Sequence, residues 1–289
     1  MTYFAIEILG SGGAVRTPRP GCTCERCTQA RRLGLPWARC GPSVFVHGPD
    51  VLIDTPEEIC IQLDRSHVRN IAAGLYSHWH PDHTNGRRVW ETRNADFLHW
   101  PPQSICTPIY LPPRVAADFA KMDILAAFHY MQKMGYVEVR VMDQPFELNG
   151  WRVSALPLHE SYVYAYLFEE IDGARRVLVA MDELFGWSPP AELAGVDLAV
   201  LPKGLSEFHP FSGQRLIPID HPVLASEATD VQTLAMVEQL RPKKLIFMHI
   251  EEPEVLTPPE LDRLAHDLAV QRGWDVTFAY DTLVVELMA

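Results

Sequence analysis

The sequence predicts an α+β protein built as a four-layer αββα sandwich, in which two mixed β-sheets face each other and helices cover the outside. The chain divides into two halves, and each half is rich in strand patterns first and helical patterns later. Apolar residues make up 47% of the 289 residues and charged residues 21%, as in a globular protein with a full core. No linker, low-complexity tract or short repeat interrupts the chain, so we predict a single domain over residues 1–289.

Strands and helices follow from runs of apolar residues and from turn residues. Two hairpins are predicted from turn signals: one turns at residues 48–50, and the other at Asn149-Gly150. In the first half, strands are predicted at 4–9, 43–47, 51–55, 71–77, 108–111 and 137–142, and helices at 56–65 and 112–134. In the second half, the hairpin that turns at Asn149-Gly150 spans 146–156, further strands are predicted at 162–168, 176–180, 196–201, 243–249, 276–280 and 282–287, and helices are predicted at 229–240 and 261–270.

Residues 78–83 place three imidazoles and one carboxylate within six positions, directly after a buried strand. His78 and His80 are two residues apart, so in an extended segment both rings point to the same face. A proline then turns the chain, which brings Asp82 and His83 to a second position nearby. Imidazole suits zinc, iron and manganese, and a carboxylate adds a hard oxygen ligand. The spacing therefore indicates two adjacent metal ions.

Three thiols, Cys22, Cys24 and Cys27, lie within six residues. Thiolates that close together suit a structural zinc ion, which needs a fourth ligand from elsewhere in the chain. Cys40, just ahead of the strand at 43–47, is one candidate, although a small buried core residue explains it equally well. Six cysteines in a reducing compartment are not expected to form a disulfide framework.

The net charge of −12 and the pI of about 5.4 describe an acidic surface. Such a surface repels long polyanions, which argues against extended DNA or RNA as a partner. No apolar run approaches the roughly 20 residues of a membrane-spanning helix. The first residues look like a strand and not like a signal peptide, so we expect a cytoplasmic protein.

The pattern His-x-His-x-Asp-His after an apolar strand resembles the signature of the metallo-β-lactamase superfamily, whose fold is the αββα sandwich. The Cys-x-Cys-x-x-Cys pattern soon after the first strand resembles the PhnP branch of that superfamily. Further single residues match the superfamily's ligand order, each at a predicted strand end. By this resemblance His78, His80 and His159 bind one metal, Asp82, His83 and His249 bind the other, and Asp182 bridges them.

The resemblance implies roles for three more positions. Asp54 matches an aspartate that organises the loop carrying the ligand histidines. Glu183 competes with Asp182 for the bridging role, but the first acid after the strand is the better match. In the PhnP branch the fourth zinc ligand is a histidine three residues after the last active-site histidine. That position is Glu252 here, so the fourth ligand is either Glu252 or Cys40.

The function implied by the resemblance is that of a dinuclear metal-dependent hydrolase, first of all a phosphodiesterase for a small, linear or cyclic, phosphodiester. Two divalent ions, manganese, zinc or iron, hold a bridging hydroxide as nucleophile and neutralise phosphoryl charge. Asp82 and Asp182 hold these metals, and one further zinc is structural. His221, ahead of the helix at 229–240, matches the proton donor to the leaving group, with His209 as runner-up.

Two other functions stay open. The same site would also hydrolyse a carboxylic ester, lactone or thioester. A non-catalytic carrier resembling the pyrroloquinoline-quinone biosynthesis protein PqqB shares the clustered cysteines, although such proteins depart from the full histidine pattern retained here. The expected partner is a small anionic molecule, with no membrane and no long nucleic acid. Dimers are common in the superfamily, so a homodimer is also consistent with the resemblance.

Aromatic residues cluster after the histidine motif, in Trp90, Phe97 and Trp100, ahead of a Pro-Pro break. They either line a substrate entrance or cover the core, and we expect at least half of them to be core.

Overall fold

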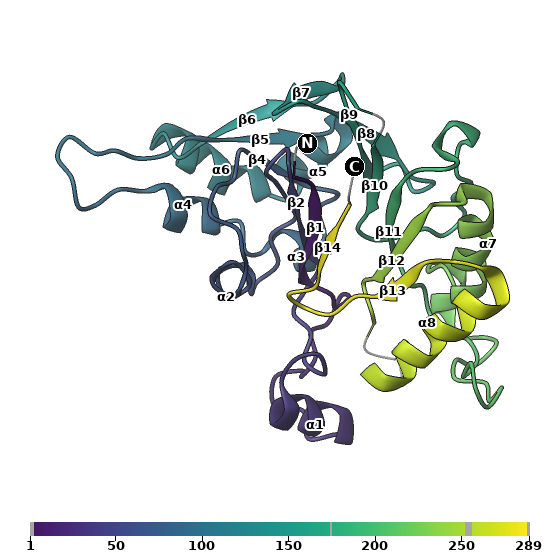
Figure 1. Cartoon of the computed structure of the whole chain (residues 1–289). Helices are drawn as coiled ribbons and strands as arrows, with labels where there is room; N and C mark the ends of the chain where they lie inside the picture. The colour runs from purple at the N-terminus through teal and green to yellow at the C-terminus, as the bar shows by residue number, and fades with distance from the viewer. Residues whose placement is uncertain (1–2, 174, 252–255, 288–289) are drawn as a thin grey trace.

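Two seven-stranded sheets form the centre of the protein (Figure 1). The computed structural model describes residues 3–173, 175–251 and 256–287. In strand order, the first sheet contains β14 (Val284–Glu286), β1 (Ala5–Gly10), β2 (Ser43–His47), β3 (Val51–Ile53), β4 (Ala73–Leu75), β5 (Thr107–Leu111) and β6 (Val137–Val141). The second contains β13 (Val276–Phe278), β12 (Lys244–Met248), β11 (Leu198–Pro202), β10 (Arg176–Ala180), β9 (Tyr164–Glu170), β8 (Trp151–Pro157) and β7 (Phe146–Leu148).

Helices cover the outer face of each sheet, which gives four layers. The first sheet is covered by α2 (Ile59–Arg65), α4 (Val89–Asn94), α5 (Pro113–Lys121) and α6 (Ile124–Lys133), whose apolar residues join one core cluster with that sheet. The second sheet is covered by α7 (Asp230–Leu240) and α8 (Pro258–Arg272). The remaining helical segments are α1 (Glu25–Leu33), α3 (Pro81–Thr84), η1 (Ala191–Leu193) and η2 (Pro222–Ala225). The predicted αββα sandwich is confirmed.

The alternation of side chains along each strand builds the layers. Val44 and Val46 on β2 point into the cluster between the two sheets, whereas Phe45 points into the helix-facing cluster. Successive side chains of a strand point to opposite faces, so a strand buried on both sides is apolar throughout. β14 returns from the second half of the chain to pair with β1, which ties the two halves together.

Each sheet is antiparallel on one side and parallel on the other. β3, β4, β5 and β6 run parallel, and so do β10, β11, β12 and β13. The carboxyl ends of parallel strands meet at one edge of a sheet. The loops that follow β4, β10 and β12 therefore gather at neighbouring edges, where the predicted ligands lie.

The local predictions hold with one main exception. The second hairpin turns where expected, because Asn149 and Gly150 both take positive φ angles of 49° and 81°. The single helical stretch predicted at 112–134 is wrong. Asp123 adopts a left-handed conformation with φ of 56°, and the chain forms α5 and α6 on either side of it. Among the described residues, no helix is both long and apolar enough to cross a bilayer.

Candidate metal centre

Three strand ends deliver the clustered ligands. β4 leads through a short loop to His78 and His80, and α3 then carries Asp82 and His83. Asp182 follows β10, and His249 follows β12 directly. His249 has a φ of 50°, so the backbone adopts a left-handed conformation at this ligand position.

These side chains form two groups that share one carboxylate. His78, His80 and Asp182 make one group, and within it the ligand atoms lie no more than 4.8 Å apart. The other group contains Asp82, His83, Asp182 and His249 within the same limit. Six of the seven predicted ligands are thus brought together, and Asp182 occupies the shared position expected of a bridging ligand.

Buried atoms without hydrogen bonds show that these residues fit metal ions. His78, His83 and His249 each have a buried Nε2 atom without a hydrogen-bond partner among the described residues, and so does Asp82 at Oδ2. His83 Nε2 is 3.2 Å from Asp82 Oδ2, and His249 Nε2 is 3.4 Å from Asp182 Oδ1. Burying polar atoms without partners costs free energy, which metal coordination would recover. Nitrogen and oxygen donors of this kind suit zinc, manganese or iron.

The electrostatics agree with a cation site. Burial by itself would lower the pKa of His83, but the charges of Asp82 and Asp54 raise it well above its ordinary value. Asp182 behaves conversely: burial favours its neutral form, yet His249 and His78 hold its pKa well below the usual range. Burial and the neighbouring His83 lower the pKa of His78 to about 4. The site therefore holds ionised carboxylates against imidazoles, a setting that stabilises positive charge, whether it is carried by protons or by a divalent cation that displaces them.

Asp54 orients two of the ligand imidazoles, as its motif predicts. His83 Nδ1 lies 2.7 Å from Asp54 Oδ2, and because a carboxylate only accepts, this nitrogen carries the proton. Ser77 donates its hydroxyl to the same carboxylate at 2.6 Å, so its oxygen accepts from His78 Nδ1 at 3.0 Å. In the neutral form of both imidazoles the proton therefore lies on Nδ1, which leaves Nε2 as the atom that binds a metal. Glu251 plays a similar part for His249, at 3.1 Å from Nδ1.

His159 is the predicted ligand that the structure places apart from these groups. It follows β8, as predicted, but its side chain is exposed. Its ring lies so close to Gly186 that a Cβ atom added there would be 2.7 Å from the imidazole. Gly186 also has a φ of 69°, so this tight approach suits glycine.

An acidic cleft adjoins the second ligand group, and it contains residues that the sequence did not mark. Its lining includes Glu183, Glu227 and Glu251 together with Asp182 and His249. Glu227 shares a hydrogen bond with Glu183, and burial followed by the charges of Glu183 and Asp182 raises the pKa of Glu227 to about 9. Glu227 therefore carries a proton at neutral pH. No local motif distinguishes it from other glutamates.

Tyr162 was also missed, since it looked like an ordinary strand residue. Its ring centroid lies 5.7 Å from that of His80 and 6.2 Å from that of His78. Burial and then the charges of Glu183 and Asp182 raise the pKa of Tyr162 to about 12. Tyr162 consequently keeps its proton and offers a neutral hydrogen-bond donor beside the first ligand group.

The two candidate proton donors lie outside the lining of this cleft. His221 is exposed at the start of η2, where its Nδ1 accepts from the N–H of Val223 at 3.2 Å. His209 is half-buried, and its Nδ1 accepts from the N–H of Phe211 at 3.2 Å. In both cases the imidazole helps to close a local turn.

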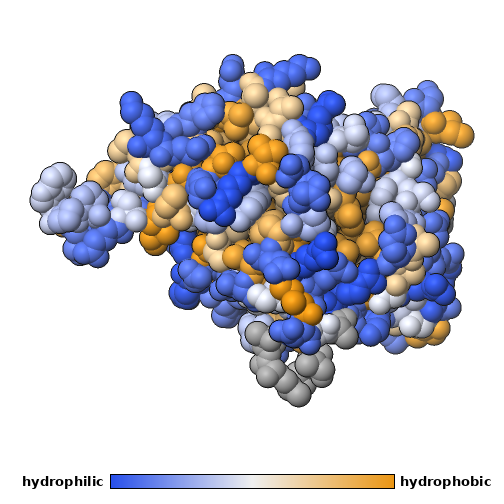
Figure 2. All heavy atoms as spheres, turned by 90° about the horizontal axis from the view of Figure 1, so that it is seen from above, coloured by the Kyte–Doolittle hydropathy of each residue, from blue (hydrophilic) through white to orange (hydrophobic). Residues whose placement is uncertain are grey.

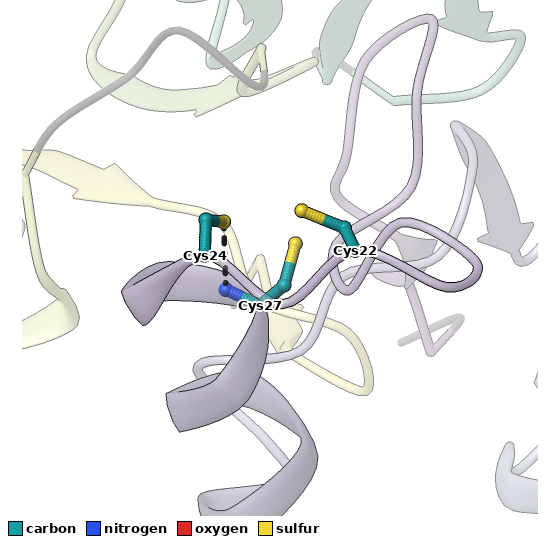
Figure 3. Close-up of side chains that lie close together, drawn as sticks. All are labelled: Cys22, Cys24 and Cys27. Atoms are coloured by element: carbon teal, nitrogen blue, oxygen red, sulfur yellow. Dashed lines mark hydrogen bonds between the residues drawn. The ribbon is translucent and has the colours of Figure 1, made fainter.

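The three clustered thiols lie together at the start of α1, in a segment that projects below the sheets (Figures 1 and 3). Cys24 caps α1, and its sulfur accepts from the N–H of Cys27 at 3.5 Å. This and the other hydrogen bonds it receives lower the pKa of Cys24, which favours a zinc-binding thiolate. Cys40 is not in this group. It is buried beside Asp281, and burial and that carboxylate raise its pKa.

The other candidate for the fourth zinc ligand, Glu252, lies outside the described residues. Within the part of the chain that the structure describes, the group therefore consists of Cys22, Cys24 and Cys27, without a fourth ligand.

Comparison with known proteins decides the family. A family model described as the β-lactamase superfamily domain matches residues 49–250. The chain belongs to the metallo-β-lactamase superfamily. The matched range covers the histidine motif, Asp182 and His249, and the superfamily membership predicted from them is confirmed. A search of curated protein sequences finds no match.

Solved structures of the metallo-β-lactamase superfamily align over nearly the whole chain. A diphosphatase of the PhnP family has a TM-score of 0.71 and 25% identity, with 99% of this chain and 98% of that chain covered. Zn²⁺-bound PqqB from Methylobacterium extorquens has a TM-score of 0.67 and 18% identity, over 98% and 100%. The short form of human tRNase Z has a TM-score of 0.61 and 17% identity, over 99% and 100%. The PhnP-like branch is confirmed, and the family together with the clustered ligands supports a metal-dependent hydrolase.

Proposed function

We propose that this protein is a dinuclear metal-dependent phosphodiesterase acting on a small, linear or cyclic, phosphodiester. The observation that carries the proposal is the pair of ligand groups joined by Asp182, with buried nitrogen and oxygen atoms left without hydrogen-bond partners. The similarity to a PhnP-family diphosphatase supports a phosphorus-centred reaction. Manganese or zinc, or else iron, fits the donor set.

Two bound cations would supply activated water and neutralise charge on a phosphoryl oxygen. The protein's own residues hold the geometry. Asp54 and Ser77 fix the tautomers of His83 and His78, and Glu251 orients His249. Tyr162, beside His80 and His78, keeps its proton, and its hydroxyl can donate to an oxygen of the substrate phosphate.

The leaving alkoxide needs a proton, and two residues are candidates. His221 is the donor predicted by the resemblance, and it begins the segment that leads to α7. Glu227, later in the same segment, lines the cleft and carries a proton at neutral pH. If His221 is the donor, His221→Ala lowers phosphodiester turnover about 10²–10⁴-fold with metal content unchanged. If Glu227→Gln produces that loss instead, the donor is Glu227.

The deciding experiment is metal analysis combined with hydrolysis of bis(p-nitrophenyl) phosphate. We expect two active-site metals and one zinc on Cys22, Cys24 and Cys27, with turnover stimulated by manganese. Asp182→Asn should remove both metals and turnover, whereas His129→Ala, an exposed histidine on α6, should change neither. Hydrolysis of p-nitrophenyl acetate but of no phosphodiester would point to a carboxylic ester. A fully loaded site without turnover of any ester would mean a PqqB-like carrier.

A further inference from the structure

The fold brings apolar side chains to the surface in two different ways. The loop of residues 95–106, between α4 and β5, projects to the left in Figure 1 and stands clear of the surface at the left of Figure 2. Phe97 and Trp100 on this loop are 84% and 92% exposed, whereas Trp90 is fully buried, so the expectation that at least half of these aromatic residues are core is wrong. Side chains that point into solvent in this way do not enclose a ligand.

The second group of apolar side chains surrounds a cavity between α7 and α8, which we call the α7–α8 cavity. Its volume is about 250 Å³. Protein interiors have few voids larger than a water molecule, whose share of the liquid is ~30 Å³. A cavity of ~150 Å³ is already large enough for a benzene ring, so this one has room for two fused rings. Most of its lining is apolar and includes Phe208, Val231, Leu234, Phe247, Leu264 and Phe278.

The walls of the α7–α8 cavity are held in place by contacts within the protein. One wall is the turn of residues 208–215, in which Phe208 pairs with Arg215 in an antiparallel bridge. The guanidinium of Arg263 on α8 lies 4.3 Å from the ring centroid of Phe211, which connects this turn to the helix. A site whose walls are already in position loses little entropy when a ligand binds.

The cavity is separate from the metal centre, although the two lie on either side of the same segments. Lys203 lines the cavity and Gly204 the acidic cleft, and likewise Phe247 on β12 lines the cavity and His249 the cleft. No described residue lines both. Val231 is 64% exposed, so a ligand reaches the cavity from solvent without passing the metal ligands.

The charges in the lining decide which kind of ligand fits. Among the described residues, Lys203 and Asp230 are the two charged members of the lining. Lys203 is 3% exposed and donates from Nζ to Ser206 Oγ at 2.6 Å, and Asp230 accepts from the N–H of Val231 at 2.8 Å. One cation and one anion balance each other. An ionised ligand would therefore lose its hydration in an apolar space that offers no net opposite charge.

We propose that the α7–α8 cavity is a binding site for an uncharged aromatic molecule of one or two rings. The rings of Phe247 and Phe278 pack against each other, with centroids 5.4 Å apart, and give the ligand an aromatic surface. Phe208 provides a third ring from the turn. A concave, mostly apolar lining with few polar groups is the usual form of a small-molecule site.

Isothermal titration of the metal-loaded full chain with indole tests the proposal. We expect about one indole per chain and a Kd below ~1 mM. Tryptamine and indole-3-acetate carry the same ring with one positive or one negative charge, and they should bind at least ~10-fold more weakly. Asp182→Asn, which removes the metals, should leave the Kd for indole unchanged, because Asp182 lies outside the cavity.

Two matched variants locate the binding site. Val231→Asp places a charge in the lining and should weaken indole binding at least ~10-fold. Val270→Asp is the control, because Val270 on α8 is 71% exposed and lies outside the lining, so its Kd should equal that of the wild type. Both valines are largely exposed, so neither change should unfold the protein, and urea unfolding checks this. Leu264→Trp, which fills the cavity with a side chain, should abolish binding.

Three results would overturn the proposal. One is a wild type that does not bind indole, or indole binding that both aspartate variants weaken equally. Another is tighter binding of tryptamine or indole-3-acetate than of indole, which would exclude an uncharged ligand. The third is loss of indole binding with Asp182→Asn, which would place the ring at the metal centre.

Discussion

Asp54→Asn should weaken metal binding while leaving the backbone in place. Asp54 is fully buried and has a φ of 61°, a left-handed conformation that asparagine tolerates well. Its carboxylate accepts three hydrogen bonds: two from Ser77, through N–H at 2.8 Å and the hydroxyl at 2.6 Å, and one from His83 Nδ1 at 2.7 Å. An asparagine must turn its NH₂ group toward one of these donors.

The consequence is a change of tautomer. If the asparagine NH₂ replaces Oδ2, it donates to His83 Nδ1 and moves the imidazole proton to Nε2, the atom that would bind the metal. Loss of such a supporting carboxylate typically lowers metal affinity 10–100-fold, which corresponds to about 1.4–2.7 kcal/mol. The free energy of unfolding should also fall, by about 1–3 kcal/mol for the mispaired buried groups.

Chelator competition and urea unfolding, run on the same preparations, measure the two effects separately. Asp281→Asn is the matched control, because Asp281 is also buried and accepts from Ser11 N–H, Ser11 Oγ and Cys40 N–H at 2.8–2.9 Å. It should lower stability by a similar amount without changing metal affinity. The reasoning is refuted if Asp54→Asn leaves affinity within about 3-fold of wild type, or if Asp281→Asn weakens it equally.

Three further predictions concern folding and the zinc site. Gly86→Ala should lower the free energy of unfolding, measured with urea, by about 2–4 kcal/mol, because the added Cβ would lie 1.9 Å from the carbonyl oxygen of Pro56. Gly135→Ala is the control: its Cβ would meet open space, so the free energy of unfolding should fall by only about 1 kcal/mol. Burial would raise the pKa of Glu7, but hydrogen bonds from two histidines lower it below its ordinary value. Ionised Glu7 therefore stabilises the folded protein above about pH 4.5, and this contribution is lost as the pH falls below that value. The stability gap between Glu7→Gln and wild type, about 1–3 kcal/mol at pH 7, should therefore shrink toward pH 3, and an unchanged gap would contradict this assignment. Cys24→Ser should remove one zinc per chain in metal analysis and leave the two active-site metals bound.

Local pattern was enough to predict most strands, the hairpins and the central ligand cluster, whereas the four layers followed from the resemblance of the histidine motif to a superfamily with that fold. Alternating and continuous apolar runs identify strands, and a six-residue motif such as 78–83 carries its own spacing. The division of residues 112–134 into two helices was not predictable, because it depends on one residue, Asp123, adopting a left-handed conformation.

The sequence by itself determined which residue types stand at the strand ends. Six of the residues identified in this way gather in the two ligand groups. Only the tertiary structure decided which ends meet. Parallel strand order brings Asp182 and His249 to the motif. The loops leave His159 apart from it and bring Glu227 into a hydrogen bond with Glu183. The physical reason is that contacts between residues distant in the chain depend on how whole sheets and loops pack, and a local pattern does not record that packing.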